Sequence, residues 1–297
     1  MINKNSHLKR LLVKAALIKN TLLVVKGNLY IFSGLCLLVC IILFAVLGMY
    51  IIPFDPVKIG SVPMDLPPSS KHLLGTDSLG RDLFAQLCFG TLTSLQIGFL
   101  AGIIGFLIAL MVAFFGGYHG GKLDGILTIL TEVFLTTPTL IILIIIAAVV
   151  ERIEIPTMAL IIAAFAWAWP AKTMRAQVLS LKEKGFIYLS RLSGLNSLEI
   201  IMKHMIPNIL PFLGSYFAVV VSAAMISEVG LEVLGLGPRH TITLGIMLYW
   251  AMMHAAVTRN LIWWWLPPCI MLFLIFFSLF LFQRGLDVIA NPRLRGE

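Results

Sequence analysis

Long apolar runs without a charged side chain are the feature that most constrains how this chain can fold. Three runs are uncharged from end to end, at residues 29–54, 84–118 and 261–283. A bilayer core is crossed by about 20 apolar residues in a helix, because lipid offers no partner for an unsatisfied backbone amide or carbonyl. Each run is long enough to cross, so the chain is predicted to span a membrane as helices.

Three further apolar segments bring the expected number of spans to six. Residues 125–150 carry one charge, Glu132, while 156–171 and 211–227 carry none, and the last is followed by Glu228. Only 12% of the chain is charged and 59% is hydrophobic, whereas soluble domains carry about 25% charged residues. The sequence therefore predicts an all-α membrane protein with six transmembrane helices.

The distribution of lysine and arginine predicts the orientation. Six spans place both termini on one side, which then carries 16 lysines and arginines against 6 on the other. Cytoplasmic loops of membrane proteins are enriched in these residues. Both termini are therefore predicted to be cytoplasmic, in a multi-pass protein of the plasma membrane. The net charge of +8 is explained in this way without a nucleic-acid partner.

The expected domain organisation has three parts. Residues 1–28 are basic, with lysines interrupting leucines, as in an amphipathic helix lying on a membrane surface; a frayed basic tail is the alternative. Residues 29–283 form the six-span domain, and 284–297 form a cytoplasmic tail.

A polar segment at about 172–206 interrupts the apolar pattern between the fourth and fifth spans. Its stretch RLSGLNSLEIIMKHMIPN mixes charged residues with Leu and Ile at roughly helical spacing. Gly194 is expected to end one short helix, and a second is expected over 198–205, ending at Pro207. A solvated charged loop is the alternative, but exposed apolar residues usually face another surface.

This stretch resembles the coupling-loop signature of ABC importer permeases. In that family, Glu-Ala-Ala is followed four residues later by Gly and then by a His-x-x-Pro-Asn ending. Four residues stand at matching positions: Gly194, His204, Pro207 and Asn208. Three residues depart from the Glu-Ala-Ala pattern: Tyr188, Leu189 and Ser190. The departure removes the family's Glu but leaves the helix–turn–helix pattern in place.

Other stretches resemble the second permease of the dipeptide/oligopeptide/nickel importer group. They read HLLGTDSLGRDLF, WPAKTMRAQVLSLKEKGF, ISEVGLEVLGLG and GLDVIANPRLR. The resemblance implies a heterodimer with a similar permease, two cytoplasmic ATPase subunits and an extracellular substrate-binding protein. It also implies that ATP and Mg²⁺ bind to the ATPases and that this chain binds no cofactor.

The resemblance and the residue pattern together select candidate site residues. Those expected to couple to an ATPase are Glu183, Phe186, Ile187, Tyr188, Arg191, Gly194, Leu195, Leu198, His204, Pro207 and Asn208. Those expected at the outer face, for docking of the binding protein, are Asp77, Arg81, Asp82 and Trp250.

Intramembrane carboxylates and a proline select the expected translocation path or gate: Glu132, Pro138 and Glu228. A charge in lipid costs at least ~2.5 kcal/mol, so such groups are expected to face protein or a water-filled path. A purely structural partnership is the alternative, and for Glu228 and its neighbour Glu232 a structural or interface role is favoured.

No motif indicates an enzyme or a metal site. The stretch GGYHGGKL approaches a phosphate loop, but Leu123 has no hydroxyl for Mg²⁺ and the stretch joins two apolar spans. It is interpreted as a tight cytoplasmic turn. The six histidines are scattered and the four cysteines lack metal-ligand spacing.

The expected cargo is a short oligopeptide. An oligosaccharide is the rival, because Trp250 and the run 263–265 offer aromatic faces near the outer side; a metal chelate carries less weight. A stand-alone ion-coupled secondary transporter is the alternative from another class. That class predicts inverted repeats and broken or charged helices at the midplane, and the sequence shows neither.

Overall fold

A computed structural model describes residues 28–52, 54–150, 153–238 and 240–291. The predicted basic helix before residue 28 and the last six residues lie outside them. Every regular element within the described residues is helical, apart from an isolated bridge between Thr76 and Asp82. The all-helical fold class is confirmed.

Four helices are each long and apolar enough to cross a membrane. They are α2 (Leu29–Ile51), α3 (Leu83–His119), α11 (Leu210–Val233) and α13 (Ile262–Ala290). They match the first, second, fifth and sixth predicted spans. Helix α13 continues through 284–290, which were expected to begin the cytoplasmic tail.

Two bent helix pairs supply the remaining candidate spans, and they correct the expectation from the sequence that no helix is broken. Helices α4 (Gly121–Thr136) and α5 (Thr139–Val149) meet at 82°, and α6 (Ile155–Ala166) and α7 (Ala168–Lys182) meet at 46°. Pro138, between α4 and α5, has no amide hydrogen to continue a helical ladder. Counting each pair as one span gives the predicted six, and counting only long helices gives four.

Helix α7 extends well beyond the predicted end of the fourth span. The polar loop was expected to begin near residue 172, yet α7 is helical to Lys182. Met174, Val178 and Leu181 are buried at helical spacing along this extension. Their burial against neighbouring helices stabilises the helix despite the charged residues between them.

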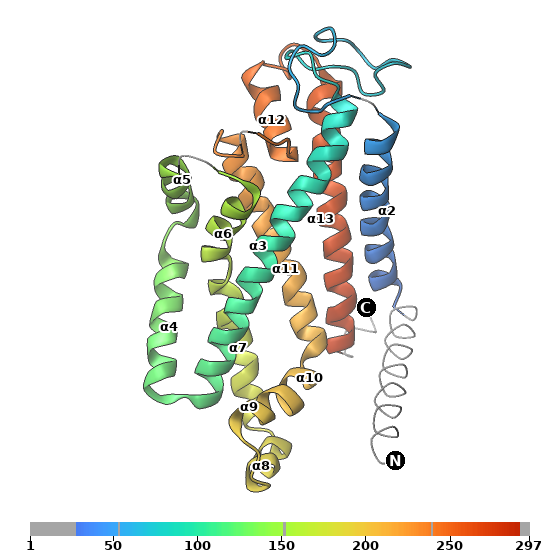
Figure 1. Cartoon of the computed structure of the whole chain (residues 1–297). Coiled ribbons are helices and arrows are strands. Elements are labelled where there is room, and N and C mark those ends of the chain that lie inside the picture. Colours follow the sequence, from blue (N-terminus) through green and yellow to red (C-terminus); the bar gives the residue numbers. More distant parts are fainter. Residues whose placement is uncertain (1–27, 53, 151–152, 239, 292–297) are drawn as a thin grey trace, which may run out of the picture.

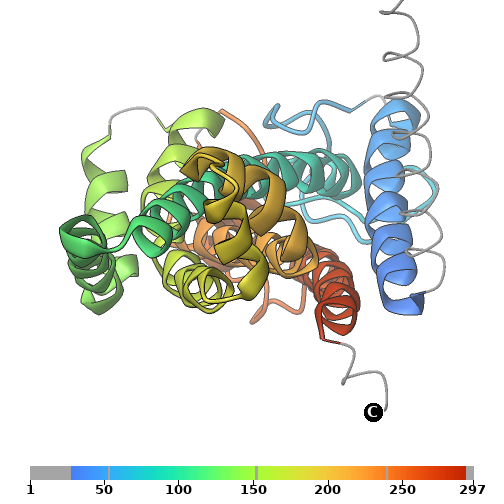
Figure 2. The ribbon, with the colours of Figure 1, turned by 90° about the horizontal axis from the view of Figure 1, so that it is seen from below.

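Helix α3 is the centre of the bundle, in contact with α2, α4, α6, α7 and α11 (Figures 1 and 2). Helices α2 and α13 pair on one flank, and α4 with α5 forms the opposite flank. Helix α11 lies between α3 and α13.

Glycines allow these helices to approach closely. A Cβ atom added at Gly102 of α3 would lie 2.5 Å from Cγ2 of Val221 on α11. One added at Gly34 of α2 would lie 2.7 Å from the backbone nitrogen of Phe282 on α13. Small residues at such points let helix backbones meet, which is the main source of packing energy between helices in lipid.

The tight turn predicted for GGYHGGKL is present between α3 and α4. Gly120 has φ 71° and Gly121 has φ 66°. Positive φ values are readily adopted by glycine, which has no Cβ to clash with the following carbonyl. The turn therefore brings α4 back alongside α3.

A cap, formed by loop residues 54–82, covers one end of the bundle together with α12 (Leu244–Met253) (Figure 1). Asp77 organises the loop. Its Oδ1 accepts hydrogen bonds from the backbone amides of Leu79 and Arg81, at 2.9 and 2.8 Å. Its Oδ2 accepts from Nε of Arg81 at 2.7 Å and from Nε2 of Gln86 at 3.0 Å.

Further polar contacts attach the cap to the helices. Asp82 begins α3 by accepting a 2.9 Å hydrogen bond from the Ala85 amide, and its other oxygen lies 2.8 Å from Nδ1 of His72. Arg259, after α12, pairs with Asp65 of the loop. Burial alone would raise the pKa of Asp65, but hydrogen bonds from Ser78 and Arg259 outweigh it and lower the pKa.

We expect Asp77→Ala to unfold the cap, because it leaves the buried Arg81 guanidinium without its carboxylate. Removing one member of a buried ion pair costs ~3–5 kcal/mol. The exposed Asp55, which accepts one hydrogen bond from the Val57 amide, supplies the control, and Asp55→Ala should change stability by no more than ~0.5 kcal/mol. Thermal unfolding and limited proteolysis of the loop measure both. Equal protease resistance of the two variants would contradict the assigned role of Asp77.

Candidate functional site

A helical hairpin projects from the end of the bundle opposite the cap (Figure 1). We define it as α8 (Gly185–Leu192), α9 (Ser197–Ile200), a π-helical turn (Ile201–Met205) and α10 (Ile206–Asn208). The two short helices predicted around Gly194 are present. The second is wider than an ordinary α-helix over its π-helical turn, which the sequence pattern did not indicate.

Local interactions specify the turn between α8 and α9. Gly194 has φ 76°, and the Leu195 amide donates to the Ser190 carbonyl at 3.3 Å, in the manner of a glycine-terminated helix. Asn196 then begins α9 with a capping box. Its side chain accepts from the Glu199 amide at 2.8 Å, and its own amide donates to the Glu199 carboxylate at 3.3 Å.

The hairpin has a buried face and an exposed apolar face. Ile187 is fully buried in the chain's own core, and Leu195 is partly buried against the same core cluster. The exposed face carries four large side chains, each 62–68% exposed: Tyr188, Leu189, Leu192 and Leu198. Ile187 and Leu195 therefore support the hairpin from within, and the surface open to a partner also includes Leu189 and Leu192. Neither is among the predicted coupling residues, because helical spacing does not tell which face meets the core.

Charged and polar contacts involve three more of the predicted hairpin residues, Arg191, His204 and Asn208. The Arg191 guanidinium lies 4.9 Å from the ring centre of Tyr118 at the end of α3. Lys203 pairs with Glu199 at 2.8 Å, and this hydrogen bond, followed by the Asn196 amide, lowers the pKa of Glu199. The Asn208 amide donates to the His204 carbonyl at 2.6 Å.

Three other predicted hairpin residues are exposed: Glu183, Phe186 and Pro207. They lie along the chain before α8, within α8 and within α10. The structure thus brings the predicted coupling residues onto one projection, although it divides them between its two faces.

A bidentate ion pair joins α4 to α7. It lies between the hairpin and the two helix bends, α4–α5 and α6–α7. Nε and Nη2 of Arg175 donate to Oδ1 and Oδ2 of Asp124 at 2.5 and 2.6 Å. Parallel hydrogen bonds of this kind fix relative orientation as well as distance. The two residues are 51 positions apart, so no local sequence pattern could have indicated the pair.

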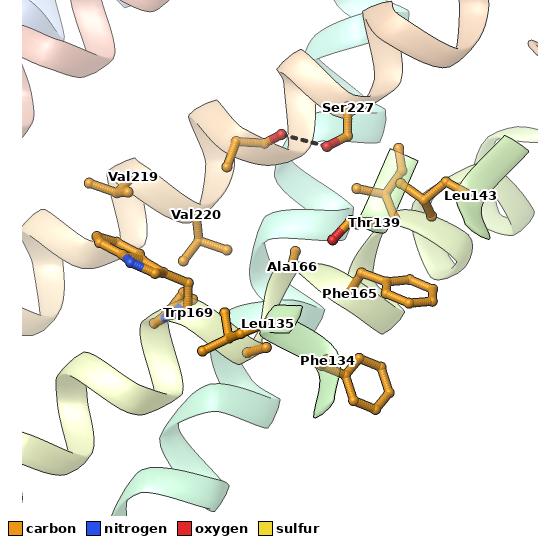
Figure 3. A pocket seen from close by; sticks show the side chains of 14 residues that line it. Phe134, Leu135, Thr139, Leu143, Phe165, Ala166, Trp169, Val219, Val220 and Ser227 are labelled. Carbon is orange, nitrogen blue, oxygen red and sulfur yellow. Dashed lines mark hydrogen bonds between the residues drawn. The ribbon is translucent and has the colours of Figure 1, made fainter. Parts of the chain in front are cut away.

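A pocket of about 330 Å³ lies where the two bent pairs face α11 (Figure 3). Aromatic side chains of Phe134, Phe165 and Trp169 form part of its wall. Its polar side-chain groups are the hydroxyls of Thr139 and Ser227 and the indole N–H of Trp169. None of the described residues that line it is charged. The Ser227 hydroxyl donates to the Ala223 carbonyl at 3.0 Å.

The predicted path residues hold different positions relative to this pocket. Pro138 immediately precedes Thr139 of its wall and is exposed. Glu132 is 56% exposed, and one of its oxygens lies 3.6 Å from Nζ of Lys172. Glu228 follows Ser227 on α11, but it is fully buried and faces Ser94 of α3. Its side chain therefore does not reach the pocket surface.

The predicted outer-face residues are mostly internal to the cap. Asp77, Arg81 and Asp82 are buried, and Trp250 is partly buried with the Arg81 guanidinium 5.7 Å from its ring centre. These side chains shape the cap rather than present themselves to a partner. Exposed apolar side chains on the same loop include Ile59 and Met64.

Comparisons with known proteins place the chain among transport components. It is 32% identical over 212 residues to the dipeptide transport system permease protein DppC of Bacillus subtilis, covering 71% of this chain and 66% of that relative. It is 36% identical over 172 residues to the oligopeptide transport system permease protein OppC of Mycobacterium tuberculosis, covering 58% and 59%. It is 29% identical over 204 residues to the nickel transport system permease protein NikC of Escherichia coli, covering 69% and 73%.

The chain thus spans between 59% and 73% of the length of these relatives. The resemblance to the dipeptide/oligopeptide/nickel group is confirmed. A family model for the binding-protein-dependent transport system inner membrane component matches residues 83–296, from α3 to beyond α13. The chain is therefore a multi-pass membrane protein that belongs to the family of inner membrane components of binding-protein-dependent transport systems.

Proposed function

We propose that this chain is a permease subunit of an ATP-driven importer and forms half of a translocation path for short oligopeptides. The observation that carries the proposal is the hairpin, which presents large apolar side chains on a turn specified by Gly194 and Asn196. A face of this kind is retained at the surface when another protein covers it.

The energy for transport is proposed to come from partner subunits. ATP and Mg²⁺ would bind to two ATPases, and this chain would receive the resulting motion at its hairpin. Burying one Leu at such a contact contributes ~1.5–3 kcal/mol. The route inward runs along α7, which the Asp124–Arg175 pair ties to α4. Both helices then reach the bends beside the pocket.

The hairpin is proposed to face the cytoplasm and the cap the outside, because 16 of the 22 lysines and arginines then lie on the cytoplasmic side. An external binding protein would dock on the cap. One chain carries one hairpin, so two ATPases call for a second permease with a hairpin of its own.

The orientation is tested by cysteine labelling in a background without the four native cysteines. Ser193→Cys places an exposed thiol in the hairpin, and Ser70→Cys places one in the cap. With an impermeant reagent added to intact cells, we expect labelling of the cap thiol alone, and labelling of both after permeabilisation. Labelling of the hairpin thiol from outside would reverse the proposed orientation.

Docking is tested by changes on the exposed face of the hairpin. Leu192→Asp should weaken ATPase binding by roughly ten- to a hundredfold, because the loss of one apolar anchor corresponds to ~1.5–3 kcal/mol. Gly194→Ala should also weaken it, since a Cβ at φ 76° strains the turn by ~1–2 kcal/mol. Gly185→Ala is the matched control, because Gly185 also has open space around it but lacks a positive φ.

The measurement is copurification of the ATPases with the assembled complex, followed by native mass determination. The wild-type complex should contain one copy of this chain, one second permease and two ATPases. Two copies of this chain without a second permease would make the complex a homodimer and contradict the heterodimer. Full ATPase recovery with both Leu192→Asp and Gly194→Ala would show that the hairpin is not the docking element.

The pocket supports a peptide as cargo. Its uncharged wall imposes no charge selection, and its aromatic rings with two hydroxyls suit apolar side chains and backbone amides. Two of the relatives above are named for dipeptide and oligopeptide transport. The nickel relative makes a metal chelate the second candidate, and no observation on the structure favours an oligosaccharide.

The substrate proposal is tested by ATP-dependent uptake into vesicles that contain the whole complex and its binding protein. We expect uptake of short peptides but not of an oligosaccharide or a nickel chelate. Trp169→Ala should lower peptide uptake about three- to tenfold, equivalent to roughly 0.7–1.4 kcal/mol. Phe273→Ala on α13, an exposed aromatic outside the pocket, should leave uptake unchanged.

One outcome would contradict the proposed cargo, and another would contradict the proposed energy source. Uptake of a nickel chelate without peptide uptake would change the cargo and keep the importer. Uptake driven by an ion gradient in the absence of the ATPases would favour a secondary transporter instead.

A further inference from the structure

Two glutamates on α11 are buried without a charged partner. Glu228 and Glu232 lie one helical turn apart, and both are fully buried. Both carboxylate oxygens of Glu228 and Oε1 of Glu232 accept no hydrogen bond from the described residues. Among those residues, neither glutamate forms an ion pair. The pair is internal to this chain, so a second subunit cannot reach it.

Glu232 faces the beginning of α12. Its Oε2 accepts a 2.6 Å hydrogen bond from the hydroxyl of Thr243, the N-cap residue of α12, and the amides of Gly245 and Ile246 also face it. A Cβ added at Gly245 would lie 2.8 Å from Cβ of Glu232, so the missing side chain is what permits this approach. Amides at a helix N-terminus stabilise negative charge.

Glu228 has fewer hydrogen-bond donors around its carboxylate than Glu232 has. The polar side chain that faces it belongs to Ser94 on α3, whose oxygen already accepts a 3.1 Å hydrogen bond from the Leu244 amide. One hydroxyl does not replace the hydration of a carboxylate, because the uncompensated burial of a charge costs several kcal/mol. The only other titratable group that acts on Glu228 from the described elements is Glu232, and like charges oppose ionisation of both.

We infer that Glu228 is a proton-binding site, in which the carboxyl group remains protonated and neutral in neutral buffer. The proton removes the charge of Glu228 and its repulsion with Glu232 from the protein interior, while Glu232 keeps the donors at the start of α12. The observation that points to a proton is the pair of orphaned oxygens on a fully buried side chain.

A metal ion fits the surroundings less well. Among the described residues, no three or more His, Cys, Asp and Glu side chains gather to hold one. Calcium takes six to eight oxygen ligands and magnesium requires octahedral coordination, whereas the orphaned oxygens come from two carboxylates. A bound cation is therefore the outcome that the experiment has to distinguish from a proton.

The proton has a structural consequence for α11. Its buried side meets α3 at Ser94 and α12 at Thr243, while Ser227, next to Glu228, lines the pocket on another side. A neutral Glu228 therefore lets three helices pack at the point where α11 forms one wall of the pocket. This inference depends on packing within the chain and stands whether or not the transport proposal holds.

Infrared spectroscopy of the full-length chain in lipid nanodiscs tests the inference directly. The glutamate is labelled with ¹³C at its side-chain carboxyl carbon. The C=O stretching band of a protonated glutamate then moves to lower frequency, whereas the band of a protonated aspartate keeps its position. We expect such a band in neutral buffer, with its intensity reduced in Glu228→Gln and a Glu228 component retained in Glu232→Gln. Glu132→Gln, which changes an exposed glutamate, is the matched control and should also retain it.

A second measurement compares thermal unfolding of the wild type and Glu228→Gln across pH. The neutral amide mimics the protonated acid, so the two midpoints should agree in neutral buffer. At alkaline pH the wild type should fall below the variant as Glu228 loses its proton, while Glu132→Gln continues to follow the wild type. If Glu228→Gln does not fold, a labelled band that survives in both Glu232→Gln and Glu132→Gln still supports Glu228.

Three results would overturn the inference. The labelled band is absent in neutral buffer, or its intensity is unchanged in Glu228→Gln. Alternatively, sodium, potassium or calcium at constant ionic strength stabilises the wild type but not Glu228→Gln, which would make the pair a cation site.

Discussion

The close approach of α3 and α11 is the contact on which the other features depend. Helices in lipid gain little from the hydrophobic effect between one another and associate through fitted surfaces. A side chain at Gly102 would meet Val221, so the glycine lets the two helices pack backbone to backbone. The same helix pair places Ser94 beside Glu228 and positions the start of α12. The pocket wall on α11 follows from that placement.

The two ends of the bundle differ in which side chains they bury. In the cap, charges are buried and matched, as at Asp77 and Arg81, so the loop has a defined shape without regular secondary structure. In the hairpin, backbone hydrogen bonds and a capping box define the shape, and apolar side chains such as Leu189 and Leu192 remain at the surface. A buried ion pair favours a stable cap, whereas an exposed apolar face favours contact with another protein.

The bent helix pairs connect these ends. A break at Pro138 leaves backbone groups without helical partners, and such breaks are tolerated at membrane depth where protein or a cavity surrounds them. The pocket lies at the bends. The Asp124–Arg175 pair lies on the hairpin side of the bends and ties the two bent pairs together. Under the proposed function, movement applied at the hairpin would reach the pocket through α4 and α7, the two helices that the ion pair joins.

The sequence by itself determined the features that depend on local chemistry. Uncharged apolar length predicted the spans, and glycine content predicted the turn within GGYHGGKL and the helix end at Gly194, where the structure has glycines with positive φ. The tertiary structure decided which face of each helix is buried. It placed Ile187 inside and left Leu192 outside, although both belong to one short helix.

Tertiary structure also decided every long-range pairing and the burial of the cap charges. Arg175 meets Asp124 only after α4 and α7 pack together, and Asp77 is internal only because the loop folds around it. Tertiary packing also explains why α7 continues to Lys182. Burial of Val178 stabilises helical turns whose composition is mostly polar. The physical reason is common to all of these cases: periodicity along a chain defines faces, but only packing against distant segments selects the face that leaves water or lipid.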